Sequence, residues 1–161
     1  IHSHIQKSKT MAPQEQKQDQ IDVVVNRPHN AFVNNGISLV NLAGTELEKL
    51  KETDDERAGY HAFPPACLAL LKTLSGNNRC IDCAGFEPEW ASIRFGAMLC
   101  LQCSGRHRKL GVNISPVRST TLDSWTLVEI LSMLEGGNTQ LKQFFHRHKL
   151  CENNNNSNNN N

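Results

Sequence analysis

The chain has 161 residues, enough for one modest domain with tails, and its formal net charge of +1 means that bulk charge selects no class of partner. No run of apolar residues approaches the roughly 20 that a membrane-spanning helix needs. The charge is unevenly distributed, because residues 1–65 hold 7 lysines and arginines against 9 acidic residues, whereas residues 66–151 hold 10 against 6. The second part is therefore mildly basic and suits an anionic partner.

The N-terminal part, residues 1–65, is predicted to be a disordered or linker arm. Its first 20 residues are mostly polar and cannot bury enough apolar surface to offset the entropy of ordering. Thr45–Arg57 has a helix-favouring composition, but Leu47 and Leu50 are its only apolar face. We therefore expect a solvated or transient helix there, with binding of a partner as the alternative.

The globular part is predicted to begin with a helix between Pro65 and Gly76. Proline suits the first turn of a helix and glycine suits its end. The apolar residues of this stretch recur at the i, i+3, i+4, i+7 spacing of one helix face: Cys67, Leu70, Leu71 and Leu74.

Two Cys-x-x-Cys pairs follow, sixteen residues apart: Cys80 and Cys83, then Cys100 and Cys103. Each such turn directs two thiolates at one centre, and two turns complete a tetrahedral shell with no position open for water. The pattern predicts one structural Zn²⁺ ion, and the alternative is four free or disulfide-bonded cysteines. Because thiols that bind zinc are typical of reducing compartments, we expect the cytosol or the nucleus.

Two short antiparallel strands are predicted between the pairs, over Trp90–Phe95 and Met98–Leu99. Ser104–Leu110 is compatible with a helix that ends at Gly111. This helix contains four residues that need solvent or an anion: Arg106, His107, Arg108 and Lys109. By themselves they also fit a solvated helix end, but a nearby metal would hold a cation in place, as a catalytic or recognition arginine requires. With the four cysteines assigned to the metal, His107 is expected to pack or to form hydrogen bonds.

Three elements are predicted towards the C-terminus. Val112–Leu122 is typical of extended chain, and the next helix is expected to be capped by Asp123 or Ser124. A last helix, capped by Asn138, is expected to turn its apolar residues inward: Leu141, Phe144 and Phe145. Residues 152–161 form an asparagine-rich, low-complexity tail that is predicted to be disordered.

Between residues 66 and 150, three motifs follow one another in order. They are the paired cysteines, with Trp90 and Gly96 between them, then Ser104-Gly-x-His107-Arg108-x-Leu110-Gly111-Val112, and finally Val117-Arg118-Ser119-x-x-Leu122-Asp123-x-Trp125. Together they resemble the Arf GTPase-activating protein domain. The resemblance implies a small α+β zinc domain over residues 66–151, with a three-stranded sheet flanked by helices. Relatives continue with further helices where this chain turns to asparagine, so we expect either that the sequence stops before the domain ends or that an asparagine insert interrupts the domain.

The resemblance implies an activator of GTPases and not an enzyme in its own right. It would stimulate GTP hydrolysis by an Arf-type small GTPase in its GTP form, with Arg108, directly after His107, as an arginine finger. Trp90 is an implied contact with the GTPase, and core packing is its alternative. Arg118 and Asp123 are candidate contacts with the GTPase, but they can also pair internally, and a structural role is favoured for both. The expected setting is vesicle trafficking in the cytoplasm, peripheral on Golgi, endosomal or plasma membrane through other regions.

At Asn113 and Pro116, relatives often have His and Lys, so contact with the GTPase or membrane is expected to differ there. Two other functions stay open. One is a non-catalytic adaptor of the same fold, which a GTP-hydrolysis assay would separate. The other is a GATA-like finger, which has nearly the same cysteine spacing but needs a basic recognition helix. Because the helix after Cys103 is short and the later ones are not notably basic, no nucleic-acid partner is expected.

Overall fold

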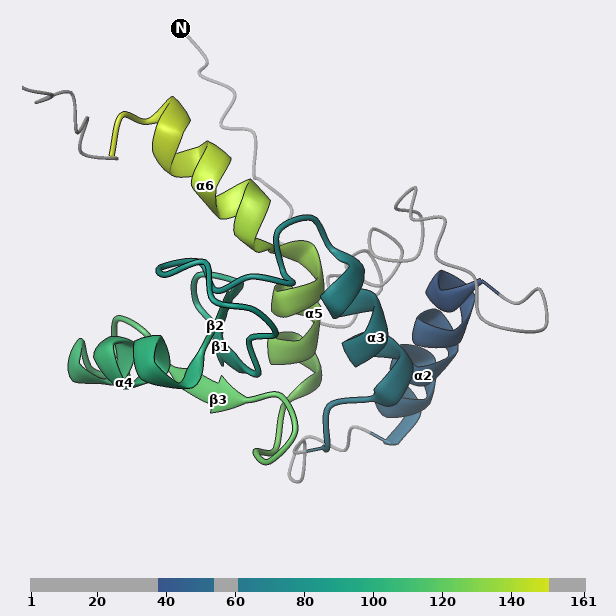
Figure 1. Cartoon of the computed structure of the whole chain (residues 1–161). Helices are drawn as coiled ribbons and strands as arrows, with labels where there is room; N and C mark the ends of the chain where they lie inside the picture. Colours follow the sequence, from purple (N-terminus) through teal and green to yellow (C-terminus); the bar gives the residue numbers. More distant parts are fainter. Residues whose placement is uncertain (1–37, 54–60, 151–161) are drawn as a thin grey trace, which may run out of the picture.

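The computed structural model describes residues 38–53 and 61–150, which form three strands and five helices. The disorder predicted for the first 20 residues and for the asparagine-rich tail lies outside these residues. Helix α4 lies at one end of the molecule and α2 at the opposite end, with the sheet and α5 between them (Figure 1). The arrangement confirms the predicted α+β class with its three-stranded sheet.

The sheet consists of β1 (Trp90–Ser92), β2 (Ala97–Leu99) and β3 (Val117–Ser119), with β1 in the middle and both pairings antiparallel. The predicted strand pair is confirmed, although β1 ends earlier than expected. Trp90 lies opposite Leu99 on one side and Ser119 on the other. Strands of this length are not stable alone, so the helices packed around them must hold the sheet in place.

The β1–β2 turn packs backbone to backbone against the end of α5 (Leu127–Glu135). Gly96 has a positive φ of 58°, a conformation that favours glycine. Its carbonyl accepts a hydrogen bond from the Gly137 amide at 2.9 Å. A Cβ atom on Gly136 would lie only 2.7 Å from the same oxygen, so this approach requires glycine. The contact fixes the sheet relative to α5.

Helices α3 (Pro65–Thr73) and α5 both contribute to the apolar core, and the predicted helix face of α3 is confirmed. Trp125, two residues before α5, is fully buried and meets Phe63 edge-on, with ring centres 5.0 Å apart. The cap of α5 differs from both predicted residues. Thr126 caps the helix, and its hydroxyl and the Glu129 carboxylate exchange hydrogen bonds with each other's amides.

Helix α2 (Leu39–Thr53) packs on α3 and α5 and belongs to the core. The prediction of a solvated or transient helix was wrong, because the helix begins at Leu39 and not at Thr45. The part of the helix before Thr45, which the prediction left out, carries the buried apolar residues Leu39, Val40 and Ala43. Together with Leu47 they form one buried face. The hydrophobic core therefore extends across the boundary predicted at residue 66.

Glu46 of α2 holds the start of α3. Its Oε2 atom accepts hydrogen bonds from the amides of Ala66 at 2.8 Å and Cys67 at 3.1 Å. The first amides of a helix have no partners within the helix, so a carboxylate at this position satisfies them. The two helices are thus joined by a specific polar contact as well as by apolar packing.

Helix α6 (Asn138–Arg147) starts after Gly137, so Asn138 is not its cap. Asn138 is buried and bridges to β2, where its Oδ1 accepts from the Met98 amide at 2.8 Å. The backbone amide of Asn138 donates to Oδ1 of Asn77 at 2.8 Å. Beyond this turn the helix runs away from the sheet (Figure 1), and Phe144 is 44% exposed. The apolar side predicted to face inward is therefore only partly covered.

Candidate metal centre and cationic helix

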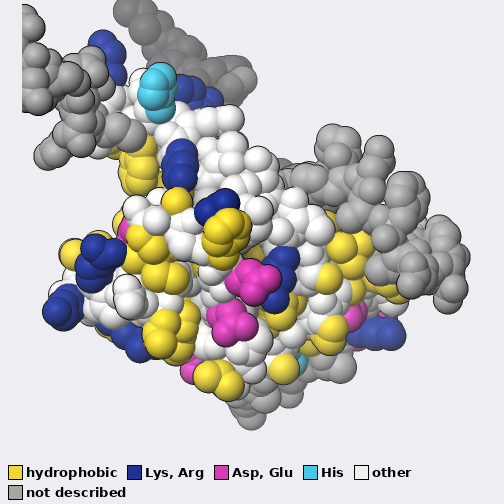
Figure 2. All heavy atoms as spheres, viewed as in Figure 1, with side chains coloured by type: hydrophobic (Ala, Val, Ile, Leu, Met, Phe, Trp, Pro, Cys, Tyr) yellow, Lys and Arg dark blue, Asp and Glu magenta, His cyan; other side chains and the backbone are white. Residues whose placement is uncertain are grey.

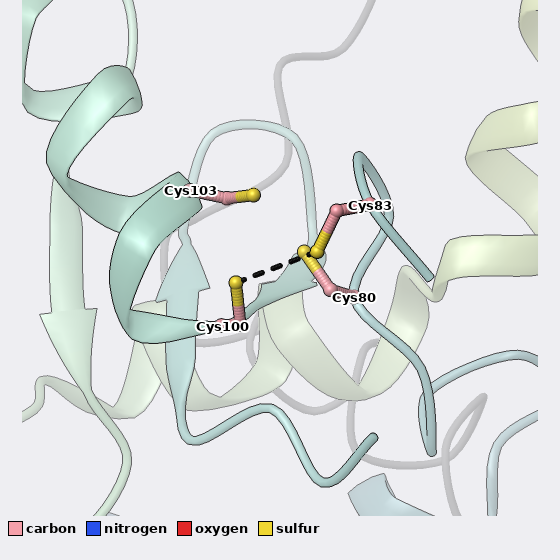
Figure 3. Close-up of side chains that lie close together, drawn as sticks. All are labelled: Cys80, Cys83, Cys100 and Cys103. Atoms are coloured by element: carbon pink, nitrogen blue, oxygen red, sulfur yellow. Dashed lines mark hydrogen bonds between the residues drawn. The ribbon is translucent and has the colours of Figure 1, made fainter. Parts of the chain in front are cut away.

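The four predicted ligand cysteines come together at one point. The sulfur atoms of Cys80, Cys83, Cys100 and Cys103 all lie within 4.8 Å of one another and face a common centre (Figure 3). Tetrahedral coordination with bonds of roughly 2.3 Å would separate the sulfurs by roughly 3.8 Å, and Cys83 and Cys100 are 3.6 Å apart. None of the five described cysteines forms a disulfide. The donors fit one tetrahedrally coordinated metal ion.

The two cysteine pairs are presented by different elements. Cys80 and Cys83 lie in a turn that is joined to β2, because the Ile81 amide donates to the Met98 carbonyl at 3.0 Å. Cys100 directly follows β2 and is the N-cap of α4 (Leu101–Lys109), whose first turn contains Cys103. A bound metal ion would therefore tie the first turn to the start of α4.

Two thiols of the site have pKa values shifted in opposite directions. The Cys103 amide donates a hydrogen bond to Cys100 and lowers the pKa of that thiol to about 7. Desolvation by burial raises the pKa of Cys103 to about 12. Arg106 donates to the Cys103 sulfur at 2.8 Å, and this bond raises the pKa of the arginine. Since metal binding requires thiolates, an ion must compete with a proton at Cys103.

Helix α4 begins at Leu101, three residues before the predicted start. Its cationic side chains point in different directions, as a rotation of about 100° per residue predicts. The Arg106 side chain points back to the metal ligand Cys103. The Arg108 guanidinium lies over the ring of Trp90, with its central carbon 4.4 Å from the ring centre. The structure thus distinguishes two arginines that the sequence presents as near equivalents.

Trp90 connects this arginine to the metal centre. It is half-buried in the middle strand and packs against a small buried cluster that includes Cys80, Leu99 and Cys103. The Trp90 ring also meets the Arg108 guanidinium. Its predicted contact with a GTPase stays a prediction.

His107 forms hydrogen bonds, as the sequence indicated. Its Nδ1 lies 2.8 Å from the Ser115 hydroxyl and its Nε2 lies 3.3 Å from Oδ2 of Asp82. Sequence reasoning did not single out either partner. Asp82 stands inside the first cysteine pair, which is a local signal, whereas Ser115 reaches His107 only through the fold.

Arg118 and Asp123 are both engaged within the chain. Arg118 pairs with Glu129, with 3.0 Å between Nη2 and Oε1, and also donates to the Ser124 carbonyl. Oδ2 of Asp123 accepts from the Ser119 amide at 2.6 Å. The internal pairing that the sequence left open is present, and their contact with a GTPase stays a prediction.

The surface around α4 combines charge with exposed apolar side chains. On the face shown in Figure 2, lysine and arginine side chains lie among hydrophobic ones at the α4 end of the molecule. The exposed apolar residues of α4 and the segment after it are Leu101, Leu110, Val112 and Ile114. In the described part of the chain, no helix has the length and apolar character that a membrane crossing requires.

Comparisons with known proteins agree with this arrangement. Residues 66–161 match the family described as "Putative GTPase activating protein for Arf". ADP-ribosylation factor GTPase-activating protein 3 of Mus musculus is 45% identical over 84 residues, which cover 52% of this chain and 16% of the relative. ADP-ribosylation factor GTPase-activating protein GCS1 of Saccharomyces cerevisiae is 45% identical over 83 residues, which cover 52% of this chain and 24% of the relative. The chain therefore matches less than a quarter of the length of each.

A solved structure shares the fold. The crystal structure of a "putative GTPase activating protein for ADP ribosylation factor" from Cryptosporidium parvum superposes with a TM-score of 0.54 at 33% sequence identity. The superposition covers 56% of this chain and 74% of the other. The family match, over residues 66–161, includes the metal centre and the cationic helix.

Proposed function

Since this chain belongs to the Arf GTPase-activating protein family, we propose that it stimulates GTP hydrolysis by an Arf-type small GTPase in its GTP form. We assign Arg108 as the arginine finger that it supplies in trans. The observation that carries this assignment is the position of Arg108, which is exposed on α4 and lies over Trp90 beside the metal centre. The protein is thus an activator that lends one group to the reaction of its partner.

The chemistry of GTP hydrolysis explains why one arginine is enough. A small GTPase holds GTP and Mg²⁺ but hydrolyses slowly, because charge builds up on the phosphoryl oxygens as the bond to the leaving oxygen breaks. A guanidinium inserted next to these oxygens neutralises that charge and accelerates the reaction roughly 10³–10⁵-fold. Its planar fork fits phosphate oxygens better than an ammonium group does.

Among the cations of α4, Arg108 is best suited to this role. Arg106 donates to the Cys103 sulfur, so its guanidinium is directed to the metal centre. Lys109 is exposed but has a single ammonium group in place of a fork. Arg108 is exposed and supported by an aromatic ring, which favours one direction of the side chain without enclosing its charge.

The metal ion in this proposal is Zn²⁺ in a structural role. Four cysteine thiolates in tetrahedral array are a donor set typical of structural zinc, and they leave no coordination position for water or substrate. The ion would supply folding energy and would fix the start of α4. Cys80 and Cys83 from the first turn, with Cys100 and Cys103 from α4, would hold it.

Other parts of the proposal concern the partner and the location. Trp90 supports Arg108, which is consistent with a place at the edge of the GTPase contact. Arg118 and Asp123 have partners within the chain, so we propose that they affect the contact with the GTPase mainly by holding the segment between β3 and α5 in place.

Thiols used as metal ligands are typical of reducing compartments, which supports a cytoplasmic location. Peripheral membrane association would come from other regions of the protein.

The test is a single-turnover GTP-hydrolysis assay with a panel of GTP-loaded Arf-type GTPases. The expected result is acceleration of hydrolysis of at least one member by catalytic amounts of this protein. A non-catalytic adaptor would bind a GTP-loaded member without accelerating its hydrolysis, and that result would contradict the proposal. Binding of duplex DNA with no effect on any GTPase would instead favour a GATA-like finger.

A further inference from the structure

His107, the residue before the proposed finger, links three separate parts of the molecule. Its ring nitrogens contact Asp82, inside the first cysteine pair, and Ser115, in the segment before β3. The Ser115 hydroxyl in turn lies 2.7 Å from that of Ser92 in the middle strand. The result is a continuous polar chain, Asp82–His107–Ser115–Ser92, from the metal-binding turn through the helix to the sheet.

This polar chain is well shielded from water at its sheet end. Ser115 and Ser92 are 1% and 0% exposed, and the His107 side chain is 15% exposed. A carboxylate can only accept, so the Nε2 atom of His107 carries the hydrogen that faces Asp82. In the neutral ring, Nδ1 then accepts from the Ser115 hydroxyl. Buried polar groups of this kind are costly to leave without a partner, so the ring orientation is strongly preferred.

The last turn of α4 has few other anchors. The buried residues of this helix are Cys103 and Ser104, both in its first half. The apolar residues at its two ends, Leu101 and Leu110, are 65% and 50% exposed. Burial therefore fixes the start of the helix but not the turn that bears Arg108. That turn is held by the polar contacts of His107, by the edge-on contact of the His107 ring with Phe95 at 6.2 Å between ring centres, and by the contact of Arg108 with Trp90.

We propose that His107 is the positioning residue for Arg108: it clamps the last turn of α4 between the metal-binding turn and the sheet, and so directs the guanidinium over Trp90. Asp82 and Ser115 are the two sides of the clamp. The functional consequence rests on the proposed role of Arg108 as the arginine finger. A displacement of about 1 Å at a reacting group can cost roughly 10²-fold in rate, so a clamp on this turn has a measurable effect.

The first experiment measures the position of Arg108 without any GTPase. In NMR spectra of the full, metal-loaded chain, the ring current of Trp90 should shift the Arg108 side-chain signals upfield. His107→Ala should remove most of that shift, whereas His146→Ala, a change of an exposed histidine on α6, should leave it unchanged. An unchanged shift in a folded, metal-loaded His107→Ala variant would overturn the proposal.

Conservative variants separate positioning from general stability. His107→Asn can keep the contact with Ser115 and His107→Gln the contact with Asp82. Since the Ser115 contact is the shorter and more buried one, Asn should restore the Arg108 shift more fully than Gln. If His107→Ala does not fold, Ser115→Ala takes its place, and it should reduce the shift with the metal still bound. A Ser115→Ala chain with the same shift as the parent, or a His107→Asn variant with no more of the shift than His107→Ala, would refute the clamp.

The second experiment uses GTP hydrolysis. His107→Ala should lower the maximal single-turnover rate by at least about tenfold, with little change in the affinity for the GTP-loaded partner. If the parent accelerates no GTPase, the proposed function fails, but the NMR result still decides whether His107 positions Arg108. If the parent is active and the NMR shift is lost without a loss of rate, the clamp does not serve catalysis and this inference is wrong in its functional part.

Discussion

The guanidinium carbon of Arg108 lies 4.4 Å from the centre of the Trp90 ring. The two residues come from α4 and from the middle strand, and Trp90 lies opposite Leu99, directly before the metal ligand Cys100. A cation above an aromatic face is attracted by about 0.5–1 kcal/mol at an exposed site. This is enough to favour one direction of a long side chain while leaving its charge available. The proposed finger is thus connected through Trp90 to the sheet and to the metal centre.

Replacement of Arg108 by lysine should abolish most of the stimulation of GTP hydrolysis. Lysine keeps the charge but loses the planar fork, and we expect a loss of at least about 10²-fold in the single-turnover rate. Affinity for the GTP-loaded partner should fall much less, because the contact strengthens mainly in the transition state. Metal content and circular dichroism should match those of the parent. Arg106→Lys is the matched control, and a loss of similar size there would show that bulk charge, and not geometry, is responsible.

Replacement of Trp90 should affect the rate through Arg108. Trp90→Phe keeps an aromatic face beneath the guanidinium, whereas Trp90→Leu removes it. The leucine variant should be slower by roughly threefold, the equivalent of the cation–π energy, and the phenylalanine variant should stay close to the parent. The comparison is made in a background of Arg108 and again in one of Arg108→Ala, which leaves no cation over the ring. If leucine slows both backgrounds equally, Trp90 acts by some route other than supporting the finger.

Removal of the metal should unfold the domain. Structural zinc contributes of the order of 10 kcal/mol of binding free energy in small domains, so Cys80→Ala or a strong chelator should remove cooperative thermal unfolding. Cys67→Ala is the matched control: this buried thiol donates to the Ala43 carbonyl, outside the metal site, and its replacement should preserve one metal ion per chain. A metal analysis that finds no ion in the folded parent would refute the assignment.

Metal affinity should depend on pH in a predictable direction. Cys103 has a pKa raised to about 12 in the metal-free site, so it must lose a proton on binding throughout the neutral range. Affinity should therefore weaken as the pH falls. Below about pH 7 Cys100 must also lose a proton, and the decline should become steeper there. A titration with a competing chelator at several pH values measures this, and an affinity independent of pH would contradict it.

Replacement of Asn138 by alanine should destabilise the fold well beyond the effect of an exposed asparagine. Its side chain accepts from the Met98 amide and donates to the carbonyls of Arg79 and Met98. Loss of these partners leaves buried backbone groups unsatisfied, at a cost of the order of 3 kcal/mol. Asn78→Ala, at an exposed position, is the control. Chemical denaturation compares the two, and equal stabilities would show that water replaces the lost bonds.

Helix α2 should contribute to the stability of the core. Leu47 is fully buried, so Leu47→Ala should cost about 2–5 kcal/mol, whereas Leu50→Ala, at a partly buried position, should cost less. Hydrogen exchange should show protected amides along α2, and limited proteolysis should retain it in the core fragment. Rapid exchange throughout α2 in a folded chain would contradict its place in the core.

The sequence by itself determined the metal centre, the α3 helix face and the strand pair. Each depends on short-range rules, because the Cys-x-x-Cys turns, the helical period and the residue types typical of strands are all recognised within a few positions of one another. The same holds for the position of Arg108 directly after His107, which identified the proposed finger by resemblance. These features need no knowledge of what packs against them.

Only the tertiary structure decided which charges are available and which residues are buried. Arg106 and Arg108 are near equivalents in sequence, yet one meets Cys103 and the other Trp90, because the helix turns them towards different neighbours. Likewise, α2 belongs to the core since α3 and α5 cover its apolar face. The link from Asp82 through His107 to Ser115 joins residues whose meeting depends on the register of the sheet and the packing of α4. Such contacts are set by distant parts of the chain, and no local pattern encodes them.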